Sequence, residues 1–510
     1  MELKLKKTGH EYYETVVFTP FSSEITKENI VPDSCADIAR IVETTGAVQM
    51  TGREIGEDGR ICASGMLKVD ILYIAEKESG PRALHLQIPF QCCSEEQCGF
   101  EPCFCDIKAQ VLSLETRLLN PRKVLTHGEL RLFPSCCKSV AIQVAEDVDD
   151  CPHIQLLRQE KSCTVVAAVK EKEFSFTEEI PVSPGRNGVA EVISSRAELR
   201  TTDCKLIGSK LVLKGLAAVV ILYRDTEGAL LVMQQEIPFS QILDGSGVEE
   251  DWETYPELTL CAIQCAPGSD SAPHDPHMLQ VTAHLRARVV LSREQHIQLI
   301  SDLYSTKGEV RCDSTAISLR EDSQHLTRRQ SGRVVLETGT AVKTVVDMEA
   351  GPLDAVIRAQ DDRLEGEIRA RCLYCDEHDG FHAVRGSFPV SMQIQRPPAS
   401  AASGKLQVLS QDLTATIVPE GLELRFPMEW EIEQHIPRSC SCINAVELDE
   451  EERPMSGAQP SLILRRAGEG ESLWHLAKQY RTTCSAIMEV NDLSEGAPLP
   501  CDRLLLIPKA

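Results

Sequence analysis

Apolar and polar residues alternate along most of the chain, with the two-residue period that is typical of half-buried β-strands. The clearest example is Met66–Tyr73, which is followed by a polar turn at 76–80 and a second alternating run over Ala83–Ile88. Two such runs joined by a short polar turn predict an antiparallel β-hairpin. Since no long segment with helical periodicity interrupts the first 446 residues, the pattern predicts a mainly β protein.

The same hairpin pattern occurs three times. Its second copy comprises Leu216–Tyr223 and Ala229–Ile237, and its third comprises Glu367–Tyr374 and Phe381–Phe388. A further alternating strand is predicted after each hairpin, at Asp106–Leu114, Leu279–Leu285 and Leu406–Ile417.

Landmark residues recur at a nearly constant spacing across the three copies. A glycine precedes each first strand, and a Leu-Tyr pair ends that strand: Gly65 with Leu72-Tyr73, Gly215 with Leu222-Tyr223, and Gly366 with Leu373-Tyr374. A proline motif closes each hairpin, at Ile88-Pro89-Phe90, Ile237-Pro238-Phe239 and Phe388-Pro389-Val390. The glycines and the tyrosines are 150 and 151 residues apart, and the prolines 149 and 151. Such agreement indicates an internal repeat.

A period near 150 residues has the length of a whole domain, whereas solenoid repeats span about 20 to 50 residues. We therefore predict three tandem antiparallel, sandwich-like domains at residues 1–150, 151–311 and 312–446, arranged like beads on a string. Residues 447–461 are acidic and proline-bounded, which is typical of a solvated linker.

The last segment, 462–510, has a different pattern. Apolar residues at Leu473, Leu476, Ala477 and Tyr480 have helical spacing, and Ser472 can cap that helix. Thr483 can cap a second helix that ends at Asn491, and short apolar runs flank both helices. The segment is therefore predicted to be a small βααβ domain.

The 510 residues carry a formal net charge of -24. Binding to nucleic acid or to an anionic membrane requires clustered Lys and Arg, so neither is expected. No apolar run follows the N-terminal charges as in a secretory signal, and no segment approaches the length of a membrane span. We expect a cytosolic protein whose 21 cysteines are free thiols.

Candidate chemistry is sparse. The cysteines at 92, 93, 98, 103 and 105 form the densest cluster, but their spacing fits no standard zinc or iron–sulfur pattern. Cys372 and Cys375 flank a strand tyrosine and are expected to point to opposite faces. His378, Asp379 and His382 fit a solvated hairpin turn better than a metal site. No phosphate-binding loop or hydrolase motif is present, so we expect no cofactor, no metal and no enzymatic activity.

The predicted first helix of the last domain carries a candidate docking face. Trp474, Lys478 and Arg481 lie at i, i+4 and i+7, beside the apolar stripe rather than within it. An aromatic side chain next to cations is typical of interface hot spots. The alternative is that Trp474 only packs against the turn between the helices.

The last domain resembles a LysM domain. The resemblance rests on the run Gly470–Ala477, the turn Tyr480–Thr483, the helix end Val490–Leu493 and the final strand motif that begins at Pro500. It implies a binding surface made by Gly470, Glu471, Ser472, Trp474, Lys478, Arg481, Asn491, Pro500 and Asp502. The glycine and glutamine usual in the final motif are replaced here by Cys501 and Asp502, which favours a protein ligand over an N-acetylglucosamine glycan.

The repeats, together with Leu3–Lys7, Ile30–Ser34 and Asp37–Arg40, resemble the SPOCS-domain spore morphogenetic proteins of the SipL type. This resemblance implies a mother-cell cytosolic protein at the forespore surface, which helps to assemble the spore coat and docks to the coat-basement ATPase through its LysM domain. The alternative is a cell-wall accessory protein that binds peptidoglycan.

Overall fold

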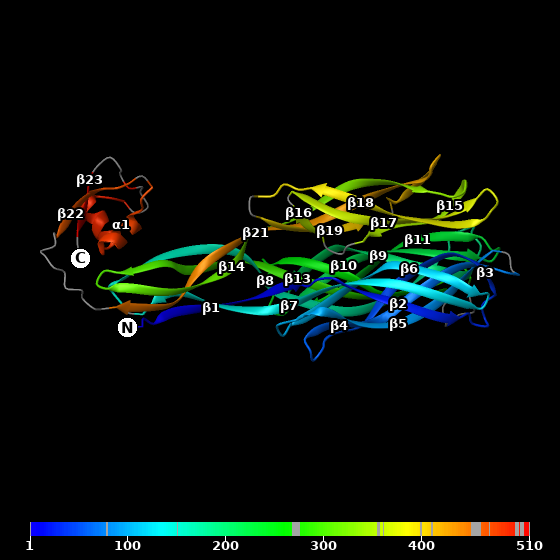
Figure 1. Ribbon diagram of the computed structural model, residues 1–510, viewed down its shortest axis with the longest axis horizontal. Coiled ribbons are helices and arrows are strands. Elements are labelled where there is room, and N and C mark those ends of the chain that lie inside the picture. The colour runs from blue at the N-terminus through cyan, green and yellow to red at the C-terminus, as the bar shows by residue number, and fades with distance from the viewer. Residues whose placement is uncertain are drawn as a thin grey trace.

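The computed structural model describes residues 2–77, 80–149, 151–267, 276–353, 357–360, 362–397, 400–409, 412–449, 461–468, 470–494, 499 and 504–508. In this part of the chain, antiparallel strands make up almost all of the regular structure, and two short helices lie near the C-terminal end (Figure 1). The predicted mainly β fold with a small βααβ domain is confirmed.

The first repeat is a sandwich of two sheets. One sheet has the order β3 (Ile38–Ile55), β4 (Arg60–Ala75), β5 (Pro81–Gln97). In the other, β2 (Phe21–Ile30) and β6 (Phe104–Asn120) flank the first half of β7 (Lys123–Val148), and β1 (Leu5–Val17) pairs with its second half. Buried side chains from both sheets, including Leu67, Ile71 and Leu130, fill the interior.

The other two repeats use the same plan with the first two strands merged into β8 (Ile154–Pro181) and β14 (Glu309–Glu337). In the second repeat β9 (Val189–Ile207), β10 (Lys210–Asp225) and β11 (Leu230–Asp244) face β8, β12 (Glu253–Pro267) and β13 (Met278–Ser305). In the third, β15 (Val342–Pro352), β17 (Arg363–Asp376) and β18 (Phe381–Gln393) face β14, β19 (Ala401–Val408), β20 (Thr414–Val418) and β21 (Gly421–Asp449), and β16 (Ile357–Gln360) joins the two sheets.

All three predicted hairpins form, as β4–β5, β10–β11 and β17–β18. The predicted later strand needs correction, because its copies are not equivalent. Residues 106–114 lie in β6, whereas residues 279–285 lie in β13, which takes the place of β7. Residues 406–417 are divided between β19 and β20. Neighbouring strands of one sheet line the same core. Alternation alone therefore cannot tell which of these strands a given run of residues forms.

The landmark glycines make room for an aromatic ring on the neighbouring strand. Gly65 pairs with Phe90, and a Cβ on Gly65 would lie 2.8 Å from the phenyl ring. Gly215 pairs with Phe239 in the same way, and a Cβ on Gly215 would also collide with the phenyl ring. In the third repeat the partner of Gly366 is Val390, so the permuted motif places no aromatic residue opposite that glycine.

Three long ribbons extend from the sandwiches and pack into a stalk (Figure 1). We define the stalk as β1 with 135–148, 154–166 with 292–305, and 309–321 with 436–449. Its core includes Val148, Leu303 and Leu448, one from each repeat. Each of these ribbons depends on the other two to bury its apolar face.

The sandwiches also share a core. Leu72, Leu222 and Leu373, the leucines that precede the three landmark tyrosines, are buried together in one cluster. One sheet also runs through strands of both the first and the second repeat. The bead-like arrangement is therefore wrong: the repeats pack around a common centre, because these apolar positions bury one another.

The ends of the repeats lie in the stalk. The strands β14 and β21 pass through residues 311 and 446, the predicted domain boundaries, and they pair there, with Arg311 opposite Glu447. Of the predicted linker 447–461, residues 447–449 belong to β21 and residues 450–460 lie outside the described residues.

The C-terminal module consists of β22 (Leu462–Arg466), α1 (Leu473–Tyr480), α2 (Cys484–Asn491) and β23 (Leu504–Pro508), with β22 paired to β23. Both predicted N-caps are confirmed, since the side chains of Ser472 and Thr483 accept hydrogen bonds from the backbone N–H groups three residues on. Leu476 and Ile487 are among its fully buried residues.

The expectation that every cysteine is a free thiol is wrong at one pair. Cys62 and Cys93 are direct cross-strand partners in the β4–β5 hairpin and form a disulfide. The cysteines are 31 residues apart in sequence, and only strand pairing brings them together.

Candidate functional site

The candidate docking face of the LysM-like module lies against the tip of the stalk. Helix α1 places Trp474 and Lys478 one turn apart, and Arg481 caps its C-terminal end in the left-handed conformation. All three side chains contact residues of the stalk. The predicted face therefore forms an interface within the chain itself.

Asp302 is the centre of this interface. Its carboxylate accepts a hydrogen bond from the Trp474 indole Nε1–H at 2.7 Å and another from the Lys478 ammonium at 2.5 Å. Arg481 adds a peripheral ion pair with Glu309, at 3.7 Å. Since the Arg481 and Glu309 side chains are both about half exposed, solvent weakens this outer pair, and Asp302 provides the stronger anchor.

Tyr304 supplies the apolar part of the contact. Its ring meets the Trp474 ring edge-on, with centroids 4.9 Å apart, and its hydroxyl donates to the Thr482 carbonyl at 2.6 Å. Tyr304 is buried and belongs to the same hydrophobic core as Leu476 and Ile487 of the module. The aromatic contact therefore joins the module to the stalk through a continuous packed core.

The electrostatics of the site agree with these contacts. Burial alone would raise the pKa of Asp302, but the hydrogen bonds from Lys478 and Trp474 outweigh burial and lower it. Burial raises the pKa of the Tyr304 phenol above its ordinary value. At neutral pH, Asp302 is therefore an anion that accepts and Tyr304 a neutral hydroxyl that donates.

Only the second repeat offers this pair among the three ribbon ends. Next to the buried Val148 and Leu448, the other ribbons carry Asp149 and Asp449 where the second ribbon carries Tyr304. Sequence reasoning missed Asp302, Tyr304 and Glu309 as functional residues. A comparison of the three repeat ends contains a signal, because the second repeat has a tyrosine at the position where the first and third repeats each have an aspartate.

The remaining predicted surface residues mostly shape the module. Gly470 has a φ of +78°, which favours glycine in the turn before α1. Glu471 accepts hydrogen bonds from Arg465 at 2.7 Å and from the Gly468 backbone N–H at 2.9 Å. Ser472 is the N-cap of α1. Pro500 and Asp502 lie outside the described residues.

Asn491 is a structural residue of the module rather than part of an exposed surface. Its buried side-chain amide donates to the carbonyls of Ile487 and Leu506 and accepts from the Leu506 N–H. These bonds tie the end of α2 to β23.

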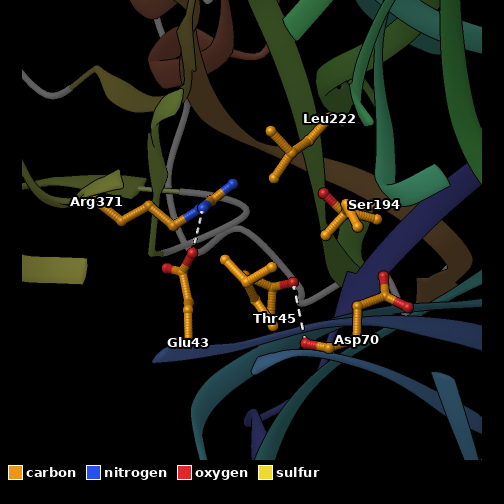
Figure 2. A pocket seen from close by; sticks show the side chains of 8 residues that line it. Glu43, Thr45, Asp70, Ser194, Leu222 and Arg371 are labelled. Carbon is orange, nitrogen blue, oxygen red and sulfur yellow. Dashed lines mark hydrogen bonds and ion pairs between the residues drawn. The ribbon is translucent and has the colours of Figure 1, made fainter. Parts of the chain in front are cut away.

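A second cluster of polar residues lies where the three sandwiches meet. Figure 2 shows Glu43 of β3 and Arg371 of β17 pointing toward each other across a small hollow that Ser194 and Leu222 of the second repeat also line. The hollow therefore has walls from all three repeats.

Arg371 connects the carboxylates around this hollow. It forms ion pairs with Glu43 at 2.9 Å, with Asp347 at 2.8 Å and with Glu349 at 2.8 Å. Arg196 of the second repeat binds Asp347 through two hydrogen bonds. Burial alone would raise the pKa of Asp347, but the two guanidinium groups outweigh it and lower it. This network joins side chains of all three repeats and so fixes the repeats relative to one another.

The sequence-level metal candidates are not assembled into a site in the described part of the chain, where no group of three or more His, Cys, Asp or Glu side chains is placed to hold a metal ion. Cys93 of the dense cluster is in the disulfide. Cys372 is buried whereas Cys375 is partly exposed. The His382 ring N–H donates to the Asp376 carboxylate within its own hairpin.

Two regions of the chain match models of known protein families. The SipL family model, described as the SPOCS domain, matches residues 188–266, which span the second repeat from β9 through β12. The LysM domain model matches residues 468–508, from the turn before α1 to the end of β23. The chain carries a SipL-type SPOCS domain and a LysM domain. Together, the SPOCS and LysM domains fit a sporulation coat-associated protein with a module of the peptidoglycan-binding type.

The SPOCS match covers one repeat, and the landmark spacing relates the first and third repeats to it. No curated protein and no solved structure matches the chain. Among the described residues, none of the helices is long and apolar enough to span a membrane.

Proposed function

We propose that this protein is a non-enzymatic scaffold for spore coat assembly in the mother-cell cytosol, and that its LysM domain docks to the coat-basement ATPase at the forespore surface. The observation that carries the proposal is the chemistry of the Trp474 face. That face recognises a protein surface, the stalk tip, through an aromatic contact and charge-assisted hydrogen bonds.

The SPOCS repeats suit a scaffold because they form one packed body. A shared leucine cluster and a buried ionic network join the sandwiches, and a common core joins the ribbons of the stalk. A rigid body of this kind can present the same surfaces to several partners in a fixed geometry, which favours multivalent assembly.

The LysM face suits a protein ligand better than a glycan. Its central contacts are with a carboxylate and a phenol, and its cations, Lys478 and Arg481, select for acidic groups. N-acetylglucosamine glycans carry no such charge. A partner with an acidic residue beside an aromatic one would reproduce the contacts made by Asp302 and Tyr304.

A partner that uses this face must displace the stalk tip. The apparent affinity for the partner then equals the affinity of the free module multiplied by the fraction of molecules in which the module is free of the stalk. Binding would be favoured where the partner is concentrated, as on a polymer that covers the forespore.

The test is a binding assay with the purified full chain, the purified ATPase polymer and, separately, chitin oligomers and peptidoglycan. Retention on the polymer, and its loss in a Trp474→Ala variant that keeps its circular dichroism spectrum, would support the proposal. A variant with a substitution remote from this face, Arg117→Ala, is the matched control. Saturable binding to the glycans with no retention on the polymer would overturn the proposal in favour of a wall-binding role.

A further inference from the structure

A pair of thiols in the first repeat is arranged for oxidation. Cys105 of β6 and Cys136 of β7 are direct cross-strand partners, and their Sγ atoms lie 3.3 Å apart. The same sandwich already contains a disulfide between direct cross-strand partners, Cys62 and Cys93. The chain thus holds one oxidised and one reduced pair with the same strand relationship.

The reduced pair needs little movement to form a bond. A disulfide has a sulfur–sulfur distance of about 2.05 Å, so the two Sγ atoms must approach by roughly 1.2 Å. The ladder bonds between β6 and β7 already hold the two backbones at the spacing of a strand pair. Side-chain rotation alone can close the gap, since Cys105 and Cys136 face each other on one side of the sheet.

The two thiols differ in access and in acidity. Cys136 is buried, whereas Cys105 is partly exposed. The hydrogen bond from the Cys136 thiol lowers the pKa of Cys105 against the effect of burial, and the charges of Arg53 and Arg288 assist while that of Asp106 opposes. The same bond, with burial, raises the pKa of Cys136. Cys105 is thus the more accessible and the more acidic of the two thiols, and Cys136 is the buried hydrogen-bond donor beside it.

We propose that Cys105 and Cys136 form a peroxide-responsive modification site, with Cys105 as the attacking thiol and Cys136 as the resolving thiol. The Cys105 thiolate attacks one oxygen of hydrogen peroxide, the O–O bond breaks, and the released hydroxide takes up a proton to become water. The resulting sulfenic acid is then attacked by Cys136, which forms the S–S bond and releases a second water. Peroxide is reduced by two electrons, and the two thiols supply them.

Neighbouring cysteines are less suited to resolve the sulfenic acid. Cys98 is buried, and its thiol donates to the Phe100 carbonyl at 3.2 Å. Cys137 follows Cys136 on the strand and therefore points to the opposite face. Cys103 is exposed and serves as a reference for general thiol reactivity.

The test treats the purified full chain with a limiting amount of hydrogen peroxide and maps its disulfides by mass spectrometry of an unreduced digest. The expected product is a peptide linked through Cys105 and Cys136, lighter by two hydrogens and restored by dithiothreitol. In Cys136→Ser, a sulfenic acid at Cys105 should accumulate and react with dimedone. In Cys105→Ser, neither product should form.

Two further variants keep the outcome decisive. Cys312→Ser removes an exposed cysteine in another repeat and should leave the cross-link unchanged. Cys136→Ala replaces Cys136→Ser if the serine variant loses its cooperative melting transition. Oxidation of Cys103 and Cys312 without the Cys105–Cys136 link, or a link from Cys105 to any other cysteine, would overturn the proposal.

Discussion

The substitution Arg371→Met tests whether the buried ionic network holds the three repeats together. Methionine keeps much of the length of the side chain and removes the charge. Glu43 and Asp347, whose side chains are only 4% and 2% exposed, then lose an ion pair each. Asp347 keeps Arg196, but Glu43 keeps only Arg385, with the nitrogen and oxygen 3.4 Å apart. The main cost is therefore the buried charge of Glu43, which only the longer ion pair with Arg385 still compensates.

Removing one partner of a buried pair costs about 3 to 5 kcal/mol. If roughly 450 residues unfold together at about 2.1 cal/mol/K each, the entropy of unfolding is about 0.9 kcal/mol/K. The expected fall in Tm is then about 3 to 5 °C. Arg117→Met is the matched control, because the Arg117–Glu115 pair is exposed, with side chains 79% and 68% accessible. This control should change Tm by less than about 1 °C.

The assay is differential scanning calorimetry at neutral pH, extended by the double variant Arg371→Met/Glu43→Gln. Because glutamine removes the orphaned charge, the double variant should be more stable than Arg371→Met alone. Two results would refute the reasoning: a Tm for Arg371→Met within 1 °C of the parent, or a double variant in which the losses simply add.

Three further predictions concern other parts of the molecule. Leu222→Ala should lower the free energy of unfolding by about 2 to 5 kcal/mol in denaturant melts, because Leu222 is fully buried at the meeting point of the repeats; a loss under 1 kcal/mol would contradict a shared core. Burial raises the pKa of Glu257, but Lys405 and other cations outweigh burial and lower it from 4.5 to about 2. Its stabilising effect is present above pH 4.5 and is lost as the pH falls toward 2, so acid titrations of Glu257→Gln and the parent should differ near pH 6 and converge near pH 2; parallel curves would contradict this. Trp474→Ala should weaken partner binding by roughly 1 to 3 kcal/mol in calorimetric titration while circular dichroism stays unchanged; loss of folding would instead mark Trp474 as a core residue.

The sequence predicts the local structure well, because local structure depends on alternation and capping. The hairpin at Met66–Ile88 and the caps at Ser472 and Thr483 are all confirmed. Alternation reports which residues are buried but not which surface buries them. Leu72 and its two counterparts were recognised as landmarks, yet only the structure places them against one another.

The candidate site shows the same limit. The spacing of Trp474, Lys478 and Arg481 predicts that they share one face of a helix, outside its apolar stripe. In the structure these residues do form one face, which contacts the stalk. Their partners Asp302 and Tyr304 precede them by more than 150 residues and carry no motif of their own. The disulfide between Cys62 and Cys93 was missed for a related reason, since hairpin register had to be known to pair the two cysteines.

The most direct test of the account compares the affinity of the ATPase polymer for the full chain, for Asp302→Asn and for Trp474→Ala. Asparagine keeps the shape of residue 302 but removes the charge that holds Lys478 and Trp474. A charge-assisted hydrogen bond contributes about 1.5 to 3 kcal/mol, so freeing the module should tighten binding by roughly 10- to 100-fold. Tighter binding by Asp302→Asn and weaker binding by Trp474→Ala are predicted. Equal affinities for all three proteins, or no binding by any of them, would contradict a role for the Trp474 face in docking.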